Sequence, residues 1–489
     1  MRTNQRTRIS YKIVDIIVIL ISLLLLIYTG IRAATLSFTF DESLSFNRFV
    51  SLRFMDIVSY KIVSSNNHMI NTLFMKYISM LFGTNELLLR LPSLFSHLIY
   101  IIFSYRIIRK ASSPYVVLAG FLFLNLNPFL LDYFSLARGY AMAVSFTVVS
   151  VYFLFNYIEN NKTNNIRWSL IFAMLAVLSN FCLLIFYVSL ITVINIYWIS
   201  SDRGIRLKDL IKKNMPVLIS VLILVVIMFE PLRKLIKFKE LYDGGNTGFW
   251  TDTVGSLIYS SLYGQSYYQI ALEYAKYFIL ISILIMIITL VYRFYLMRWK
   301  IFSEKITVAF LLLFITCIVS VAQHILLHSL FLINRMALFF IPLFFIPLVL
   351  IFSDFVRIKK MKILSLSFLL IISGALIFHT ISSLNTSSTL MWRYDADTKK
   401  MLSDLGTQVK NSEKTHIKLG VVWLFEPTSN FYRTTKKYEW LDKVTWDNYR
   451  TLDYDYYFLA DSCMSFIKAN NLSVIRHYPV SNSYLLKQD

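Results

Sequence analysis

The chain has 489 residues, of which 57% are hydrophobic and only 16% are charged. Soluble domains have about 45–50% apolar and about 25% charged residues, so this composition excludes an ordinary soluble protein and indicates several membrane spans. The formal net charge of +21 is compatible with nucleic-acid binding. However, much of the basic excess lies in short segments that flank apolar runs, which is typical of membrane topology, and we expect no nucleic-acid partner.

Eleven apolar runs are long enough to cross a bilayer, which takes about 20 helical residues. The predicted helices are Ile13–Ile31, Leu87–Ile107, Tyr115–Leu131, Gly139–Ile158, Trp168–Asn180, Phe181–Ser200, Met215–Leu232, Tyr274–Tyr292, Ile306–His328, Arg335–Phe352 and Ile363–Ser382. The fifth and sixth runs are nearly continuous and fit either one bent helix or a tight hairpin. The first run also fits a signal peptide, but it is long for one, and we expect an uncleaved anchor.

Basic residues next to membrane spans stay in the cytoplasm, and this predicts the orientation. Six basic segments are found: Arg2 to Lys12, Arg106 to Lys110, Lys162 with Arg167, Arg203 to Lys213, Arg293 to Lys305, and Arg357 to Lys362. An even number of predicted helices separates each successive pair, so all six can face the cytoplasm. The sequence therefore predicts an integral protein of a bacterial inner (plasma) membrane with its N-terminus inside and its C-terminus outside. An error of one helix would reverse the placement of the C-terminus.

The chain divides into two predicted domains. Residues 1–384 form an all-α polytopic membrane domain. Charged residues interrupt the apolar pattern after that, so residues 385–489 are expected to form a small α/β domain outside the membrane. Its predicted elements are a helix at Ala396–Val409 and strands at Lys418–Phe425, Tyr454–Ala460 and Leu472–Tyr478. The cysteines Cys182, Cys317 and Cys463 show no metal-type spacing and are interpreted as small buried side chains.

Two long outer segments are the places to look for function. The segment 32–86 contains the adjacent acids Asp41 and Glu42, then two amphipathic stretches, Leu52–Val63 and Met69–Phe82, that fit a position along the interface. The segment 233–273 has several glycines among tyrosines, a composition typical of a mobile loop over a site. The two acids are either a solvated helix cap or part of a site. Because adjacent residues do not share a face, we expect one of them to react and the other to orient or bind.

Four ordered motifs resemble a known family. They are Asp41-Glu42 after the first span, Asn66-Asn67-His68, the run from Leu81 to Ser93, and the run from Asn127-Pro128 to Ala137-Arg138-Gly139-Tyr140-Ala141. Together they resemble the N-terminal half of the GT-C membrane glycosyltransferases, with bacterial members similar to protein O-mannosyltransferases and to the lipid A aminoarabinose transferase. Asn334-Arg335 matches more loosely. The resemblance is specific over about the first 140 residues, topological over the remaining membrane part, and vague for the C-terminal domain.

The resemblance implies transfer of a sugar from a polyprenyl-phosphate donor to an acceptor at the outer leaflet. It makes Asp41 the catalytic base, gives Glu42 the second acidic position, and makes Arg138 a candidate for the donor phosphate, with Tyr140 in the same motif. The chemistry agrees, since a glycosyl phosphate already has an anionic leaving group and needs only one base and cations. Direct displacement would invert the anomeric centre.

One position departs from the family pattern. Many members carry an acid directly before the Ala-Arg pair, where this chain has Leu136. Asp132 lies four residues earlier, one helical turn away, and either supplies the carboxylate or is an exposed helix end.

Other polar residues complete the candidate substrate-binding set. His68 fits a substrate contact, an acid-base role or an ordinary surface histidine. Arg90 fits a pairing with an outer carboxylate or a side chain that extends to the headgroups, whereas Arg335 suits a phosphate.

A divalent metal is possible but is assigned no ligands. His324 and His328, spaced i, i+4, could hold one, but no carboxylate accompanies them in the sequence. The loop tyrosines fit either sugar stacking or an interfacial belt; they are Tyr259, Tyr263, Tyr267 and Tyr268.

Two other functional classes compete with the transferase. A transporter or lipid flippase should show charges near mid-membrane and internal repeats, and neither is clear. A membrane polysaccharide polymerase or ligase also uses polyprenyl-linked sugars. The Asp-Glu pair directly after the first span favours the transferase, with protein, lipid and glycan acceptors left open.

Overall fold

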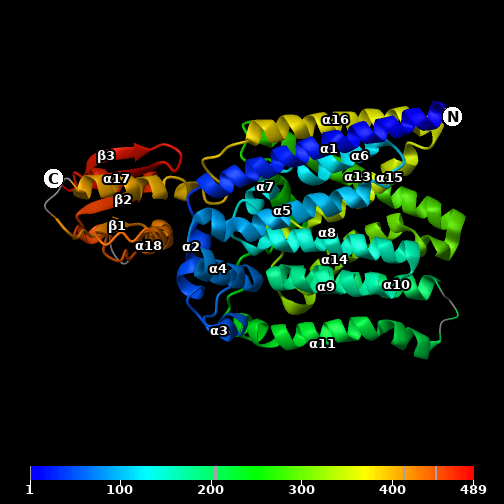
Figure 1. The fold of residues 1–489 in the computed structure, drawn as a ribbon, viewed down its shortest axis with the longest axis horizontal. Coiled ribbons are helices and arrows are strands. Elements are labelled where there is room, and N and C mark those ends of the chain that lie inside the picture. Colours follow the sequence, from blue (N-terminus) through cyan, green and yellow to red (C-terminus); the bar gives the residue numbers. More distant parts are fainter. Residues whose placement is uncertain (1, 202–203, 205, 411–413, 447–448, 489) are drawn as a thin grey trace.

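The computed structural model describes residues 2–201, 204, 206–410, 414–446 and 449–488. Arg203 and the side chains of Arg2, Arg6 and Arg8, which were used for the topology prediction, lie outside this description. The described chain forms a bundle of long helices with a small sheet domain at one end (Figure 1). This confirms the predicted fold class of an all-α polytopic part followed by an α/β part.

Nine helical stretches in the described residues are long and apolar enough to cross a membrane. Their main helices are α1 (Arg2–Thr35), α5 (Glu86–Ile108), α8 (Gly139–Asn160), α10 (Leu184–Ser201), α11 (Leu207–Lys237), α13 (Tyr268–Met297), α14 (Lys305–Leu327), α15 (Phe340–Phe355) and α16 (Lys359–Ser383). The helices α6 (Pro114–Asn125) and α7 (Pro128–Phe134) pass the same test together as one span bent by 65°. The bend falls at Asn127-Pro128, since the residue before a proline avoids helical geometry.

The remaining predicted span is α9 (Thr163–Ser179), which has 17 residues and packs along α8. At 1.5 Å per residue it is roughly 26 Å long, slightly short of the hydrocarbon core. The chain breaks at Asn180, whose side chain accepts a hydrogen bond from the Cys182 backbone N–H at 3.0 Å. It then returns along α10 to the end of the bundle that it left after α8 (Figure 1). The nearly continuous run is therefore a hairpin and not one bent helix.

Three short helices cover the end of the bundle next to the sheet domain: α2 (Phe40–Phe49), α3 (Phe54–Val58) and α4 (Met69–Phe82). The amphipathic stretch at Met69–Phe82 is confirmed as a helix, whereas Leu52–Val63 is helical only in α3. The loop after α11 contains a π-helix, η2 (Phe249–Gly255), and α12 (Ser256–Ser261). An antiparallel bridge between Gly245 and Phe331 ties this loop to the segment between α14 and α15, which also contains the short 3-10 helix η4 (Asn334–Ala337).

The C-terminal domain has a four-stranded sheet in the order β1-β2-β4-β3. The strands are β1 (Leu419–Val421), β2 (Tyr456–Ala460), β3 (Ser473–Tyr478) and β4 (Ser483–Lys487); β1 and β2 are parallel and the other pairs are antiparallel. Two helices, α17 (Thr398–Lys410) and α18 (Glu426–Thr435), complete it. The predicted strand Lys418–Phe425 is shorter than expected, because the chain turns into η6 (Trp423–Phe425) before Pro427 opens α18.

The sheet domain shares a buried core with the outer helices. Phe38, directly before α2, stacks on Phe431 of α18 with ring centroids 4.1 Å apart, and Phe46 of α2 meets the same ring edge-on at 5.1 Å. Phe38 and Phe431 are both fully buried. The short helix α2 is therefore held from the side of the C-terminal domain as well as from the bundle.

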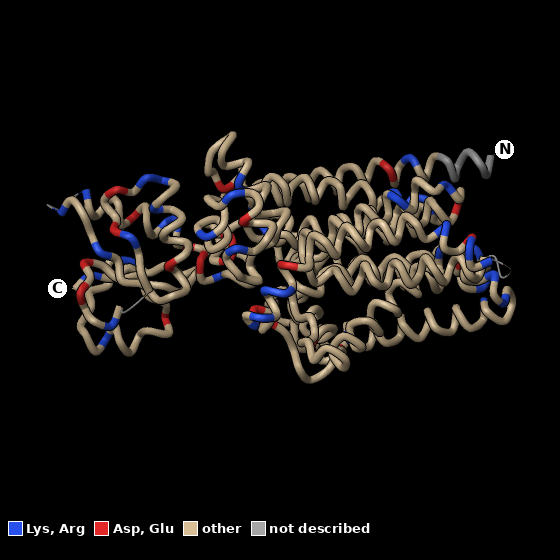
Figure 2. The backbone as a smooth tube through the Cα atoms, turned by 90° about the horizontal axis from the view of Figure 1, so that it is seen from below, with Lys and Arg blue, Asp and Glu red and all other residues tan. Residues whose placement is uncertain are grey.

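Many of the described basic residues of the bundle lie at the end opposite the C-terminal domain, while others lie at its outer end and in the C-terminal domain itself (Figure 2). At the end opposite the C-terminal domain, Glu159 pairs with Lys110 and Lys305, and Arg293 pairs with Asp354. This charge asymmetry predicts that the basic end faces the cytoplasm and the C-terminal domain lies outside.

Reporter fusions check this orientation. We expect alkaline phosphatase fused to the C-terminus to be active in cells, because that enzyme needs the oxidising periplasm. A fusion after Ser303, at the basic end, should be inactive and provides the matched control. The reverse pattern would place the C-terminal domain in the cytoplasm.

Candidate functional site

The sequence Thr39-Phe40-Asp41-Glu42 begins α2 and places both acids in its first turn. Glu42 caps the helix, since its Oε2 accepts a hydrogen bond from the Thr39 backbone N–H at 2.9 Å. Acidic side chains are favoured in this turn because the first N–H groups of a helix have no internal partner. The cap fixes where Asp41, the residue just before Glu42, projects from the helix.

Glu42 is fully buried and its carboxylate is saturated with donors. Arg90 donates to both oxygens, from Nε at 2.8 Å and from Nη2 at 2.7 Å. The Ala137 backbone N–H donates at 2.6 Å, and both the N–H and the hydroxyl of Thr39 also donate. A carboxylate with this many donors has no free lone pair for a substrate. Glu42 was placed with Asp41 in the predicted catalytic pair as the acid that orients or binds, and its saturated carboxylate fits the orienting role.

Arg90 is likewise fully buried and has no free donor. Besides the two bonds to Glu42, its Nη1 donates to the carbonyls of Ala33 and Leu36 and its Nη2 to the carbonyl of Ser37. These bonds use all five guanidinium hydrogens. The predicted pairing of Arg90 with an outer carboxylate is therefore found. Its predicted contact with substrate and its extension to the headgroups are both wrong, because no donor remains and the side chain does not reach the surface.

Arg138 brings Asp41 and His68 together. It is buried, and its Nη2 lies 3.2 Å from Asp41 Oδ2 and 2.9 Å from His68 Nε2. Its Nη1 donates to Ser45 Oγ at 3.0 Å. Its Nε is buried and has no partner among the described residues. A buried donor without an acceptor is costly, so this nitrogen is a candidate contact for a bound anion.

Arg335 approaches the same carboxylate from the 3-10 helix η4, which precedes α15. Its Nη2 lies 3.9 Å from Asp41 Oδ2 and 3.2 Å from Asp243 Oδ2, and its Nε donates to Tyr140 Oη at 3.1 Å. Its guanidinium group also lies over the Trp392 ring, 5.5 Å from the centroid. Asp41 therefore lies between two arginines, and its side chain is 13% exposed. A partly exposed carboxylate is thus flanked by two cations, one of which also pairs with Asp243.

His68 is buried, and the alternative of an ordinary surface histidine is wrong. A guanidinium group can only donate and a carbonyl can only accept. His68 therefore accepts from Arg138 at Nε2 and donates from Nδ1 to the Ser179 carbonyl at 3.2 Å. Burial, followed by the charge of Arg138, lowers the pKa of His68 well below its usual value. A neutral imidazole with this tautomer orients Arg138.

Asp132 does not supply a carboxylate to Arg138. It is buried, so the exposed-end alternative is also wrong. Its oxygens accept from Arg32, from the Tyr263 hydroxyl at 2.7 Å and from the Leu390 backbone N–H at 2.9 Å. Arg32 also donates to the Ser388 carbonyl at 3.0 Å. The Arg32–Asp132 pair therefore anchors the segment that leads into the C-terminal domain.

The predicted histidine pair does not form a metal site. The helix α14 ends at Leu327, and His328 has a left-handed backbone with φ of 49°. His324 stacks on Phe331 at 4.1 Å, and its Nδ1 lies 2.7 Å from the Ser329 carbonyl. Across the described residues, no group of three His, Cys, Asp or Glu side chains is placed to hold a metal ion.

Three residues near Asp41 were missed in the sequence: Asp243, Trp392 and Asp395. Asp243 and Trp392 contact Arg335, and Asp395 is buried next to the start of α2. All three come from segments hundreds of residues from Asp41. A cluster of acids directly after the last span was visible in the sequence, but nothing in it indicated a contact with α2.

Comparisons with known proteins agree with the resemblance found in the sequence. Residues 69–230 match a family model described as dolichyl-phosphate-mannose-protein mannosyltransferase. The fold is similar to that of ArnT from Cupriavidus metallidurans in the apo state, with a TM-score of 0.55 and 10% identity, covering 97% of this chain and 98% of that one. A structure of the same enzyme bound to undecaprenyl phosphate matches with a TM-score of 0.52 and 9% identity, over 97% and 98% of the two chains. No curated protein sequence matches the chain.

Replacing Glu42 by Gln tests the buried pair. We expect the free energy of unfolding to fall by about 3–5 kcal/mol, since the change leaves the Arg90 charge buried and uncompensated. Thermal unfolding in detergent measures the loss. Asp56, whose partners Arg53 and Lys61 are exposed, provides the control: Asp56→Asn should unfold at nearly the wild-type temperature, because exposed ion pairs contribute little to stability. Equal midpoints for the two variants would contradict the structural role of Glu42.

The stability of the folded protein should depend on pH through His68. Because the pKa of His68 is lowered in the folded state, the unfolded chain takes up a proton below its ordinary pKa of about 6.5 that the folded chain does not. Stability should therefore decrease as the pH falls from 6.5 to 5, and part of this loss should disappear in His68→Asn. Thermal midpoints of both proteins across this range measure the difference. Parallel curves would contradict the assignment.

Proposed function

We propose that this protein is a membrane glycosyltransferase that moves a sugar, a hexose or a pentose, from a polyprenyl-phosphate donor to an acceptor at the outer face of a bacterial inner membrane. The N-terminus is then cytoplasmic and the C-terminal domain extracytoplasmic. The observation that carries the proposal is the position of Asp41 between Arg138 and Arg335, 3.2 Å and 3.9 Å from their guanidinium nitrogens. The family match over residues 69–230 and the ArnT-like fold support the same class.

The two arginines are the proposed phosphate site. Arginine binds phosphate through a planar set of donors, and the buried Arg138 Nε has no acceptor among the residues that the structure describes. A donor phosphate here would take over part of the charge that Asp41 now compensates. Asp243, which is about half exposed, would release Arg335 in the same way. Undecaprenyl phosphate, which is bound in one of the similar structures, is a lipid of the expected class.

The proposed reaction is a single displacement. The acceptor hydroxyl attacks the anomeric carbon, its proton passes to the Asp41 carboxylate, and the bond from that carbon to the phosphate oxygen breaks. The phosphate leaves with an additional negative charge, which Arg138 and Arg335 stabilise. Attack from the side opposite the leaving group inverts the anomeric centre. No second carboxylic acid is needed, which agrees with the saturation of Glu42 by structural donors.

The bundle suits a lipid-linked donor. A polyprenyl chain remains in the bilayer, so its phosphate must enter from the side at the level of the outer helix ends. Arg138 and Arg335 lie at such ends, at the N-cap of α8 and in the helix η4 just before α15. A flippase would need polar groups along the full path of the headgroup. The helix α2 and the start of α8, which carry Asp41 and Arg138, instead lie at the end of the bundle next to the C-terminal domain (Figure 1).

A membrane polymerase or ligase remains the alternative, and the transferred unit distinguishes it. A transferase of the proposed kind consumes a lipid monophosphate sugar and releases the lipid monophosphate. A polymerase or ligase moves a longer glycan and leaves the monophosphate sugar unused.

Incubation of the purified protein with polyprenyl-phosphate sugars in detergent tests the proposal. We expect the wild-type protein to consume a donor, and Asp41→Asn to be at least about 100-fold slower, since general bases contribute roughly 10²–10⁴-fold. The control Asp56→Asn removes a carboxylate of the same outer segment that touches neither arginine and should react at the wild-type rate. Release of lipid phosphate, followed by mass spectrometry, is the readout. Wild-type activity in Asp41→Asn would exclude Asp41 as the base.

A further inference from the structure

The start of α2 is held by two acids from different parts of the chain. Glu42, which lies in the first turn of α2 itself and pairs with Arg90 of α5, binds the Thr39 N–H. Asp395 binds the next N–H, that of Phe40, with its Oδ2 at 2.6 Å. Phe40 is the residue directly before Asp41, so the two acids together fix the backbone from which the proposed base projects.

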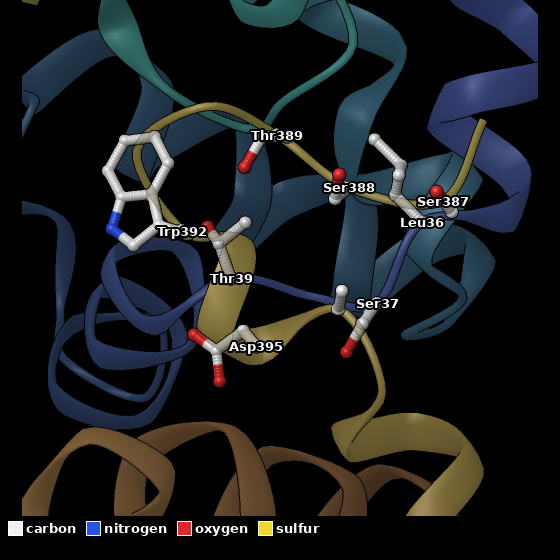
Figure 3. A pocket seen from close by; sticks show the side chains of 9 residues that line it. Leu36, Ser37, Thr39, Ser387, Ser388, Thr389, Trp392 and Asp395 are labelled. Atoms are coloured by element: carbon white, nitrogen blue, oxygen red, sulfur yellow. The ribbon is translucent and has the colours of Figure 1, made fainter. Parts of the chain in front are cut away.

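Asp395 belongs to the segment between α16 and α17, which enters the C-terminal domain. It is 1% exposed. The hydroxyl of Thr398 donates to its Oδ1 at 3.3 Å, and the hydroxyl of Thr428, on α18, forms a further hydrogen bond with it. These bonds orient the carboxyl group toward the N-terminus of α2. Figure 3 shows Asp395 next to Thr39, on the wall of a small cavity that Trp392 and Thr389 also line.

Further contacts also join α2 to the C-terminal domain. Ser43 Oγ donates to Thr428 Oγ1 at 3.3 Å, and Asn47 Nδ2 donates to the Pro427 carbonyl at 2.9 Å. With the stacked Phe38 and Phe431 rings, one face of α2 packs on α18. The helix therefore lies between the bundle and the C-terminal domain, and Asp395 contacts its backbone closest to Asp41.

We infer that Asp395 is a positioning residue for the Asp41 base, through its hydrogen bond to the Phe40 backbone N–H, and that the C-terminal domain completes the catalytic site in this way. The inference rests on the proposed function. Asp395 acts through α2 and does not contact the arginines of the phosphate site. Its loss therefore affects the placement of the base and leaves donor binding intact. A displacement of about 1 Å at a reacting group can cost on the order of 100-fold in rate.

The acceptor atom of Asp395 matters here, not its charge. Burial raises the pKa of Asp395 well above its usual value, and the negative charge of Asp41 acts in the same direction. A neutral carboxyl group still accepts the Phe40 N–H and adds no charge beside the base. An asparagine has an acceptor oxygen in the same place, so it should substitute for the aspartate.

Steady-state kinetics of the full-length protein in detergent test the inference. We expect Asp395→Ala and Asp395→Leu to lower kcat at least about 10-fold, with the KM for the polyprenyl-phosphate sugar within about twofold of wild type. Asp395→Asn should retain at least about one third of the wild-type kcat. The matched control is Asp397→Ala, which removes a carboxyl group two residues away. Within the described residues that group accepts from the Ser481 N–H and hydroxyl, both at 2.9 Å, which are distant from α2 in the chain, and the variant should behave as wild type.

Hydrogen exchange of residues 38–49 gives a readout that needs no substrate. Asp395→Ala should exchange faster in this segment than wild type, Asp395→Asn or Asp397→Ala. If wild type consumes no donor while this difference is present, the proposed function fails and the contact with α2 stands. Wild-type kcat in Asp395→Ala, an equal loss in Asp395→Asn, or a rise in KM alone would overturn the inference. It would also be overturned if neither Asp395→Ala nor Asp395→Leu gave folded protein, because Asp395 would then serve folding as a whole.

Discussion

The buried ion pair between Glu42 and Arg90 is the interaction on which the site depends. An ion pair removed from water is usually costly, because the attraction seldom exceeds the loss of hydration. Here the cost is offset by complete hydrogen bonding: five guanidinium hydrogens and both carboxylate oxygens have partners. These partners belong to the end of α1, the start of α2, α5 and the Ala137 backbone just before Arg138. One pair therefore sets the relative positions of the proposed base and the proposed phosphate ligand.

Complete and incomplete pairing separate the structural charges from the reactive ones. Glu42 and Arg90 are fully buried and saturated, so a substrate gains nothing from them. Asp41 is partly exposed, Arg335 shares its Nη2 between two carboxylates, and the Nε of Arg138 has no partner in the described part of the chain. Groups of the second kind can exchange a protein partner for a ligand at little cost. Asp41 and Glu42 are adjacent in the sequence, yet they do not share a role.

The sequence predicted the parts of this structure that depend on local pattern. Apolar runs of about 20 residues located the long helices, and the ordered motifs brought Asp41, His68, Arg138 and Tyr140 together, with Arg335 added from a looser match. The roles of Glu42 and Arg90 were not predictable in this way, because they depend on which donors surround them in three dimensions. Asp132 lay one turn from the family position, yet its partner is Arg32 at the end of the first helix. Asp395 and Trp392 reach the site from segments more than 300 residues after Asp41, a separation that no periodicity records.

The helix α2 is short, and this explains why it needs support from the C-terminal domain as well as from the bundle. A helix of 10 residues is too short to be stable in water on its own, since the first turn costs more than it gains. Packing on the bundle alone would leave its other face, with Phe38 and Phe46, in contact with water. The helix α18 covers that face, and Asp395 satisfies an N–H group that the helix cannot satisfy internally. A base that must stay within about 3 Å of an arginine while a lipid phosphate enters needs a rigid support. In this chain that support is divided between the membrane bundle and the domain that follows it.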